Sequence, residues 1–477
     1  MIQLNKYKNQ SVAVFGLGET GSSAINALIN SGAKVYAWDD NEERIANTRI
    51  IYKECNFIHP KEYNWQEIVA LILSPGIPLA YPKPHWIVKL ARSFNCTITS
   101  DIELFLEAKT TNQKVVGVTG TNGKSTTTSL IGHILKFVEK KVDVGGNLGI
   151  PVLNLNRDAE IYVIELSSFQ LDLLNMHTVI PVSATQMKKI DISVLLNITP
   201  DHIDRHGSME NYIAAKLKLI NGSKIAVIGC DNQITAGIFN DFIGDKVPIS
   251  GRALVEEHLS VSSQCSDTGI QEKSMDSSVS YLDDTCDLSD AKINLISNAE
   301  NIAAAYAVCK LLKIDRSVII NRIKSFSGLK HRNELLGKIK NVSFVNDSKA
   351  TNAESTEKAI LSYNNIYWIV GGRSKEGGIE SLSKHFPRIK KAFLIGESTE
   401  AFAATMKNKV NFVDCGNLKN AFELACKEAL SSKEEIAILL SPACASFDQW
   451  TNFEERGEAF CKMFENLKDS FTITNLI

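Results

Sequence analysis

The sequence predicts an α/β protein with three domains, each built on a mainly parallel sheet. Short apolar strands alternate with helical patterns along most of the 477 residues, which is typical of parallel α/β sheets. Two of the strands run directly into glycine-rich loops that are followed by helices, at 16–21 and 120–126. Since a chain of this length has room for about three domains, we predict boundaries at 1–111, 112–326 and 327–477.

The first region begins with a unit of strand, loop, helix and strand. We expect strands at 11–15 and 34–38, with a helix at 22–30 between them. The glycines between 16 and 21 have the spacing G-x-G-x-x-G, and Asp39 stands 18 positions after the last of them. This pattern indicates a Rossmann-like nucleotide-binding domain, and a nicotinamide-dependent dehydrogenase is one interpretation of it.

The second glycine loop, Gly120-Thr-Asn-Gly-Lys-Ser-Thr126, has the residues of a phosphate cradle, and a helix is expected at 127–137. Glycines let backbone N–H groups approach a phosphate, Lys124 adds a full positive charge, and Ser125 can reach Mg²⁺. The strict pattern has a glycine where this chain has Val118, so the loop is a shortened form of the P-loop. The alternative is an ordinary glycine turn before a helix, with a solvated lysine.

Side chains with useful chemistry follow two further strands of the central region. The strand expected at 161–164 ends in Glu165, and the strand expected at 194–198 leads into Asp201-His-Ile-Asp204. Ligands of α/β folds bind at the carboxyl ends of strands. Glu165 can therefore serve as the acid of an ATPase, and the second cluster can bind a metal ion or orient a substrate. Alternatively, Glu165 caps a helix or forms a salt bridge, and the second cluster is a turn. Lys216, on the next helix, belongs by default to a solvated face.

The third region repeats the alternation of strands and helices, which predicts a C-terminal Rossmann-like domain. We expect strands at 342–345, 366–370 and 436–440, each followed by a polar loop. The last of these loops, at 441–449, contains Cys444. We interpret this residue as a buried structural cysteine rather than a nucleophile, because no partner histidine is identifiable by spacing.

A polar stretch at 251–290, rich in serine and aspartate, separates the second region from the third. Its weak periodicity predicts surface strands and loops. An alanine-rich helix is expected after it, at 298–312.

Composition excludes several classes of protein. A net charge of −2 provides no basic field for nucleic acid. The N-terminus has no apolar segment of a signal peptide, and no apolar run is long enough to span a membrane, so we expect a cytoplasmic protein without membrane insertion. The ten cysteines form no C-x-x-C pairs, which argues against a disulfide framework or a zinc cluster.

Taken together, these sequence motifs resemble those of the Mur ligases, amide-forming enzymes that add amino acids to the peptidoglycan precursor. The Gly120 loop is shared across that family and with the folylpolyglutamate synthases. The member that adds D-glutamate is similar over most of the chain, up to about Gly457. The strings that carry this closer resemblance are Gly146–Gly149, Glu165–Gln170, Asp201–Arg205, Asn346–Asn352 and Leu440–Gln449.

The resemblance implies a reaction of ATP, UDP-N-acetylmuramoyl-L-alanine (UDP-MurNAc-L-Ala) and D-glutamate, with ATP and Mg²⁺ required. The alanine carboxylate attacks the γ-phosphate to form an acyl phosphate, and the D-glutamate amine then displaces phosphate. It also implies an N-terminal UDP-substrate domain, a central ATPase domain of the P-loop type and a C-terminal amino-acid-binding domain. We expect a monomer.

Site residues follow from the same resemblance, position by position. The implied catalytic residues are Lys124, His202 and Lys216. The implied ATP-binding residues are Gly120, Thr121, Asn122, Gly123, Lys124, Ser125, Thr126, Asn298, Asn301, Arg332, Asp347 and Lys349. The implied UDP-substrate residues are Gly18, Thr20, Gly21, Asp39, Ser74, Gly76, Asn147, Ser167 and Gln170. The implied D-glutamate residues are Thr351, Lys375, Ser446 and Phe453. The implied metal ligands are Ser125, Glu165, His202 and Lys216, the last as a carbamate.

Three rivals stand beside this interpretation. A folylpolyglutamate synthase-like ligase should lack the N-terminal nucleotide domain and the 441–449 loop. A dehydrogenase would leave Lys124 and Glu165 unexplained, and a non-catalytic nucleotide sensor would not need them intact. The chain departs from the family at Asp40-Asn41, where many relatives carry Thr-Arg, and in a longer stretch at 171–189.

Overall fold

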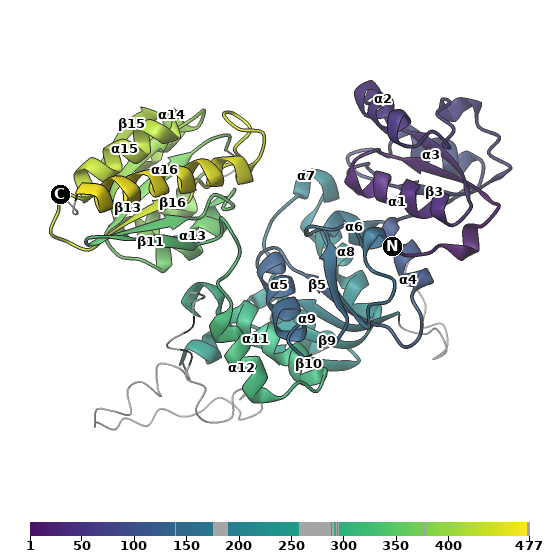
Figure 1. Cartoon of the computed structure of the whole chain (residues 1–477), viewed down its shortest axis with the longest axis horizontal. Helices are drawn as coiled ribbons and strands as arrows, with labels where there is room; N and C mark the ends of the chain where they lie inside the picture. Colours follow the sequence, from purple (N-terminus) through teal and green to yellow (C-terminus); the bar gives the residue numbers. More distant parts are fainter. Residues whose placement is uncertain are drawn as a thin grey trace. The chain divides into compact units, whose positions relative to one another are not determined.

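The computed structural model describes residues 1–138, 140–174, 189–256, 288, 291, 293, 295–374 and 378–474. The chain forms two compact units, Met1–Asp290 with Asn298–Phe326, and Ala291–Ser297 with Ser327–Ile477. Both units are α/β, as the sequence predicts (Figure 1).

The first unit contains two parallel sheets. The N-terminal sheet has the order β2-β1-β3-β4, and its strands are β1 (Ser11–Phe15), β2 (Lys34–Trp38), β3 (Ile68–Leu73) and β4 (Thr97–Thr99). The helices of this part are α1 (Glu19–Asn30), α2 (Glu42–Ile51), α3 (Trp86–Ser93) and α4 (Asp101–Ala108), with short 3₁₀ turns at Asn5–Tyr7 and Pro60–Glu62. The loop between β1 and α1 therefore lies at the carboxyl edge of this sheet.

The central sheet has the order β10-β9-β8-β5-β7-β6. Its strands are β5 (Lys114–Thr119), β6 (Val142–Gly146), β7 (Ile161–Glu165), β8 (Ile190–Leu195), β9 (Ser223–Gly229) and β10 (Asp245–Ile249). The helices around it are α5 (Lys124–Leu135), α6 (Ser168–Asp172), α7 (Ile203–His206), α8 (Met209–Asn221), α9 (Gln233–Asp241), α11 (Leu295–Leu311) and α12 (Arg316–Ser325), with a 3₁₀ turn at Val152–Asn154. All five strand pairings in this sheet are parallel.

One continuous hydrophobic core joins these two sheets. It includes Val12 and Ile25 from the N-terminal part and Leu153 and Tyr162 from the central part. The N-terminal segment takes part directly, because the Ile2 backbone N–H donates to the Leu153 carbonyl oxygen at 3.0 Å. Shared burial of this kind explains why the two sheets form a single compact unit.

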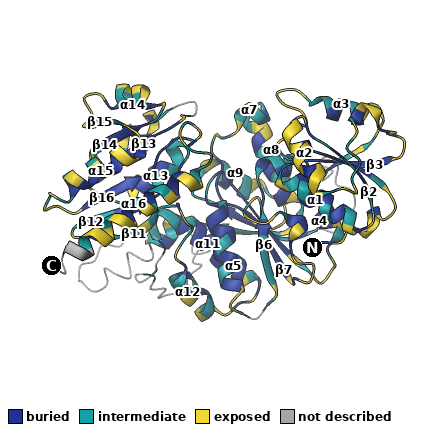
Figure 2. Cartoon of the chain, turned by 45° about the horizontal axis from the view of Figure 1, so that its top comes forward, coloured by how far each residue is buried: buried dark blue, intermediate teal, exposed yellow. Residues whose placement is uncertain are grey.

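The second unit contains one sheet with the order β11-β12-β16-β13-β14-β15. Strand β11 is antiparallel to β12, and the other pairings are parallel. The strands are β11 (Glu334–Ile339), β12 (Val342–Asn346), β13 (Ile366–Gly371), β14 (Ile389–Ile395), β15 (Phe412–Gly416) and β16 (Ile436–Leu440). The helices are α13 (Ala353–Leu361), α14 (Thr399–Met406), α15 (Leu418–Ala429) and α16 (Phe453–Thr474), with a 3₁₀ segment at Glu380–Arg388. The central strands are almost entirely buried (Figure 2).

Several sequence predictions differ from the structure, among them the starts of α1 at Glu19 rather than 22 and of α11 at Leu295 rather than 298. Helix α5 begins at Lys124 rather than at 127, so the lysine is its first residue. The strand expected at 194–198 is β8, which ends at Leu195 because the Asn197 carbonyl oxygen instead accepts a hydrogen bond from the Thr121 N–H at 2.8 Å. Residues 251–256 are helical rather than strand or loop. The remainder of the polar stretch, apart from residue 288, lies outside the described residues, as does most of the stretch at 171–189.

No helix among the described residues is both long enough and apolar enough to cross a membrane.

Candidate active site

The loop before α5 has the backbone of a phosphate-binding turn. Gly120 and Gly123 have φ values of 153° and 85°, and a Cβ on Gly123 would lie 2.2 Å from Asn301 Oδ1. Both features favour glycine, since other residues rarely adopt this backbone and no side chain fits at Gly123. The backbone N–H groups of the first turn of α5 point toward this loop's side of the helix and favour an anion at this turn. Lys124 adds a cation there, and its Nζ donates to the carbonyl oxygens of Gly120 at 3.0 Å and Thr121 at 2.7 Å.

Side chains from neighbouring elements hold this loop in place. Thr121 Oγ1 donates to the Thr199 carbonyl oxygen at 3.1 Å and lies 3.0 Å from the Tyr212 hydroxyl oxygen. The Asn122 N–H donates to Asn197 Oδ1 at 2.9 Å. These contacts fix the loop before any nucleotide binds, which reduces the ordering cost of binding.

The two asparagines predicted on α11 lie against the same turn. Asn301 Nδ2 donates to Asn298 Oδ1 at 3.1 Å, and Asn301 Oδ1 accepts from Thr127 Oγ1 at 3.2 Å. The helix expected at 298–312 therefore brings both residues to the glycine loop, although more than 170 positions separate Asn301 from Thr127 in the chain.

Glu165 lies next to this turn and has one oxygen to spare. Strand β7 pairs with β5, so Glu165 stands opposite Val118, and its side chain is buried. Its Oε1 accepts from Asn147 Nδ2 at 2.8 Å, whereas Oε2 is buried without a hydrogen-bond partner among the described residues. A buried, unpaired carboxylate oxygen is costly. Glu165 and the buried hydroxyl of Ser125 are the hard oxygen ligands that Mg²⁺ prefers, so these residues fit the ion.

Lys216 is buried rather than solvated, which overturns the default expectation for a helical lysine. Only 1% of the residue is exposed. Its Nζ donates to the Gly120 carbonyl oxygen at 2.9 Å and lies 4.6 Å from the centroid of the Tyr212 ring. Burial, together with the charge of Lys124, lowers the pKa of Lys216 well below its usual value, and Asp201 partly opposes this. A lowered pKa favours the neutral amine, which is the nucleophilic form.

His202 stands at the start of α7 and is more exposed than the groups above. Its φ is 55°, and its Nε2 lies 3.4 Å from Asp201 Oδ2. The ring centroid is 4.8 Å from that of Phe169 on α6. His206, by contrast, is buried, with Nε2 3.0 Å from Ser168 Oγ, and burial lowers its pKa. The geometry thus separates an accessible histidine from one that holds α6 and α7 together.

A pocket of about 420 Å³ lies beside the first glycine loop. Glycine and hydroxyl groups from both sheets of the first unit line it. The predicted UDP-substrate residues in its wall are Gly18, Thr20, Ser74, Gly76, Asn147 and Gln170.

The other three predicted UDP-substrate residues shape the pocket's surroundings. A Cβ on Gly21 would lie 1.8 Å from the Gly16 carbonyl oxygen, so the helix packs tightly on the loop there. Asp39 Oδ2 accepts from the Leu17 N–H at 2.6 Å. Ser167 and Gln170 form a capping box at the start of α6.

Sequence reasoning missed Arg44. It is the one cationic side chain among the described residues that line the pocket, and its Nη1 lies 3.7 Å from Asp39 Oδ2. The signal was present in the sequence, because Arg44 falls in the first turn of the helix after Asp39.

Asp40 and Asn41, where the chain departs from the family pattern, have local roles. Asp40 accepts from Trp86 Nε1 at 3.1 Å, and Asn41 caps α2.

In the second unit, Asp347 occupies a buried polar site at the end of β12. Its Oδ2 accepts from Ser441 Oγ at 2.7 Å, and its Oδ1 accepts from the Asn333 N–H at 2.9 Å. Burial raises the pKa of Asp347 to about 7. Lys349 follows in the same loop, with Nζ 5.1 Å from the ring centroid of Phe453. Arg332 precedes Asn333, so these loops bring predicted nucleotide and D-glutamate residues together.

Ser446 and Arg456 are two further buried polar residues of this unit. Ser446 is buried, and its Oγ has no hydrogen-bond partner among the described residues. Arg456, which sequence reasoning missed, is fully buried, and its Nη2 donates to the carbonyl oxygens of Ser348 at 2.8 Å and Cys444 at 3.1 Å. It therefore joins the loop after β12 to the loop after β16. The local sequence around Arg456 carries no signal of this long-range role.

Cys444 is buried, and burial raises the pKa of its thiol to about 11, which agrees with a structural role. The eight cysteines in the described part of the chain are free. Thr351 lies just before α13. Lys375 lies outside the described residues.

Comparison with known proteins gives the family of this chain. A family model described as Mur ligase middle domain matches residues 118–309, and one described as Mur ligase, glutamate ligase domain matches residues 331–444. A relative from Wolbachia sp. subsp. Brugia malayi, named UDP-N-acetylmuramoylalanine–D-glutamate ligase, is 68% identical over 100% of both chains. The chain belongs to the Mur ligase family.

Other Mur ligases extend this likeness. Relatives with the same name from Wolbachia pipientis wMel and Rickettsia prowazekii are 66% and 42% identical, covering 99% and 96% of this chain and 99% of each relative. Two solved structures from Thermotoga maritima share the fold. UDP-N-acetylmuramate-alanine ligase MurC has a TM-score of 0.54 at 17% identity, covering 96% of this chain and 99% of its own. MurF ligase in complex with ADP has a TM-score of 0.52 at 19% identity, covering 97% and 96%.

Proposed function

We propose that the protein joins D-glutamate to UDP-MurNAc-L-Ala at the expense of ATP, in the synthesis of the peptidoglycan precursor. The observation that carries the proposal is the arrangement around the Gly120 loop. A phosphate turn, a cationic Lys124, a buried Glu165 with a spare oxygen and a buried Lys216 all meet there. The relatives named above supply the substrate class.

The ATP γ-phosphate would lie at the Gly120 turn. The backbone N–H groups and Lys124 would stabilise the charge that builds up as the alanine carboxylate attacks, because two anions must approach one another. Ser125 and Glu165 would hold Mg²⁺, which supplies neutralisation of phosphate charge. Attack would form an acyl phosphate and ADP, and the D-glutamate amine would then displace phosphate.

Lys216 would act as a carbamate. Its neutral amine would add to CO₂ with release of a proton, which converts a buried cation into a carboxylate that can bind a metal ion. The lowered pKa and the burial of Lys216 favour its neutral amine, which is the reactant. The new negative charge would lie close to the Gly120 turn, where it would help to bind a metal ion. Asp201 and His202 would lie on the same side of the active site as the Lys216 carbamate.

The 420 Å³ pocket would receive the UDP-substrate. Its glycine loop offers backbone N–H groups to the diphosphate, and Arg44 offers a cation. In the second unit, Ser446, Thr351, Phe453 and Lys375 would recognise D-glutamate, while Asp347, Arg332 and Lys349 would contact ATP.

The rivals account for less of the molecule. We expect a folylpolyglutamate synthase to lack both the sheet at residues 11–99 and the loop at 441–449. A dehydrogenase would not use the buried group at Glu165. We place the enzyme in the cytoplasm as a monomer, where it would support cell-wall synthesis and, through it, cell shape and division.

Phosphate release from ATP tests the proposal. We expect release only when UDP-MurNAc-L-Ala and D-glutamate are both present, and little with L-glutamate, L-alanine or meso-diaminopimelate. Release that is indifferent to the amino acid would refute the proposed specificity, and release without the UDP-substrate would refute the proposed acceptor.

A further inference from the structure

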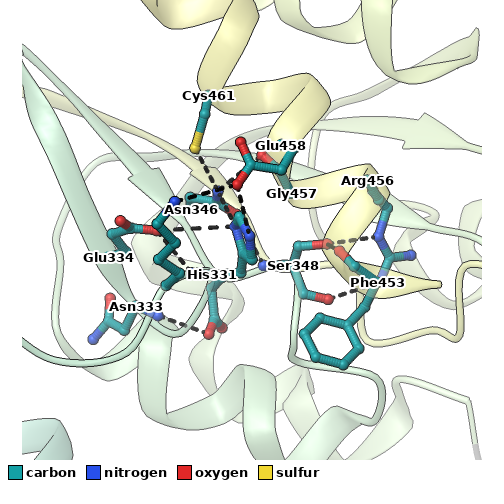
Figure 3. A network of polar contacts seen from close by, with 12 residues as sticks. His331, Asn333, Glu334, Asn346, Ser348, Phe453, Arg456, Gly457, Glu458 and Cys461 are labelled. Carbon is teal, nitrogen blue, oxygen red and sulfur yellow. Dashed lines mark hydrogen bonds and ion pairs between the residues drawn. The ribbon is translucent and has the colours of Figure 1, made fainter. Parts of the chain in front are cut away.

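A second set of metal-binding groups lies in the second unit, apart from the Gly120 turn. His331, Glu334 and Cys461 each place one potential ligand atom within 4.8 Å of the others (Figure 3). They come from three parts of the chain, namely the loop before β11, the first residue of β11 and helix α16. An imidazole nitrogen, a carboxylate oxygen and a thiol sulfur form a donor set suited to zinc.

The hydrogen bonds define the tautomer of His331. Its Nδ1 accepts from Asn346 Nδ2 at 2.9 Å, so Nδ1 carries no proton in the neutral ring. The remaining proton is on Nε2, which lies 3.6 Å from Glu458 Oε1. The lone pair of Nδ1 therefore points into the cluster while Nε2 faces a carboxylate. Histidine ligands of metals usually show this arrangement.

More hydrogen-bond acceptors surround the side-chain amide of Asn346 than it has protons to donate. Its Nδ2 carries two hydrogens, but three acceptors surround it: His331 Nδ1 at 2.9 Å, the Gly457 carbonyl oxygen at 3.0 Å and Cys461 Sγ at 3.2 Å. The amide can serve only two of them. The Asn346 amide therefore does not satisfy all three acceptors of this partly buried cluster at once.

The backbone holds the cluster rigidly. His331 is 4% exposed and has a φ of 61°. A Cβ on Gly457 would lie 2.3 Å from His331 Nδ1, so α16 packs its backbone directly against the ring. Glu334 Oε2 accepts from the His331 N–H at 2.7 Å and lies 3.9 Å from Nδ1. Ligand groups positioned this way need little ordering when a metal binds.

We propose that His331 Nδ1, Glu334 and Cys461 Sγ bind a thiophilic divalent cation of the zinc type. Binding releases the Cys461 proton to solvent and replaces the hydrogen bond from Asn346 to His331, while Asn346 keeps the Gly457 carbonyl oxygen. Water completes the coordination shell. Mg²⁺ is a poor competitor, because it prefers oxygen ligands only.

The site adjoins the residues proposed for ATP. Arg332 and Asn333 lie between the two ligands His331 and Glu334, and the Asn333 N–H donates to Asp347. Asn346 directly precedes Asp347, and its Oδ1 accepts from the Ser348 N–H at 3.2 Å. A cation that replaces the hydrogen bond from Asn346 to His331 removes one contact that holds this loop, so we infer that occupancy weakens ATP binding. This second step rests on the proposed function, whereas binding of the cation does not.

Titration of the full chain with Co²⁺, used as a spectroscopic probe for zinc, tests the site. We expect a thiolate-to-cobalt charge-transfer band in the wild type and in Cys415→Ser, a matched control in which another half-buried thiol of this unit is removed. The band should be lost in Cys461→Ser and weakened in Glu334→Gln. Thermal unfolding without metal shows that each variant is folded. Absence of the band from the wild type, or its persistence in Cys461→Ser, overturns the site.

The effect on ATP has its own readout. With the wild type, we expect Zn²⁺ to raise the KM for ATP, and with Cys461→Ser we expect no such change. Cation binding without a change in KM overturns the coupling and leaves the site standing. Failure of the proposed ligase reaction would appear as lost turnover in both proteins without Zn²⁺, and would leave the Co²⁺ result unaffected.

Discussion

The two units of this molecule use different means to build polar sites. In the first unit, local sequence builds the phosphate turn at the centre of the site, since a strand ends, a glycine loop turns and a helix begins within the span 114–126. In the second unit, side chains from distant segments meet, as when Arg456 joins Ser348 to Cys444. The difference teaches that chemistry carried by the backbone is readable in the sequence, whereas chemistry carried by long-range contacts is not.

The largest effect should follow removal of the charge at the local site. Lys124→Ala removes the side-chain cation that faces the proposed γ-phosphate, and we expect kcat to fall by about 10²–10³-fold. Steady-state phosphate release measures this, with unchanged thermal unfolding as the check on folding. A fall of less than about tenfold would mean that the backbone turn stabilises the transferred phosphate largely by itself.

Lys216→Ala should cost about 10–100-fold in activity, because it removes a proposed metal ligand. Lys224→Ala, an exposed lysine at the start of β9, is the matched control and should be near wild type. Formate or acetate should restore part of the lost activity by replacing the carbamate. If Lys216→Ala keeps the wild-type rate and does not respond to formate or acetate, Lys216 does not act as a carbamate.

How far the sequence could go differs between the units. It predicted the strands, the glycine loop and the residues at strand ends, because periodicity and turn chemistry are local. The sequence placed Glu165 and Lys124 correctly at the carboxyl edge of one sheet. It could not predict that Lys216 is buried, since the burial of Lys216 depends on packing against Tyr212. Cysteine spacing also argued against a zinc cluster, but spacing cannot show that His331 and Cys461, 130 positions apart in the chain, lie close together.

Arg44 offers a smaller test within the first unit. Arg44→Ala should raise the KM for UDP-MurNAc-L-Ala about tenfold, because a charge-assisted contact to a diphosphate is lost. The KM for ATP should stay unchanged. Arg49→Ala, on the same helix, is the control. Equal changes in both KM values would assign Arg44 a structural rather than a substrate-binding role.

The last test concerns stability, and it uses a buried carboxyl group of the first unit. Burial raises the pKa of Asp101 in the first unit to about 7, as it does for Asp347 in the second. A raised pKa in the folded state means that Asp101 favours folding at low pH and that this contribution is lost as pH rises through 7. Asp101→Asn should therefore gain on the order of 2 kcal/mol in unfolding free energy relative to wild type between pH 5 and pH 8. Urea unfolding at both pH values measures it, and a constant difference would show that Asp101 ionises normally.

The central claim is that the Gly120 turn directs the γ-phosphate onto a substrate carboxylate. UDP-MurNAc-L-Ala labelled with ¹⁸O in its alanine carboxylate tests this most directly. If an acyl phosphate forms and the D-glutamate amine displaces phosphate, one labelled oxygen must leave with the inorganic phosphate. We predict labelled phosphate in step with product formation. Product formed together with unlabelled phosphate, with the displaced labelled oxygen found in water instead, would contradict the account.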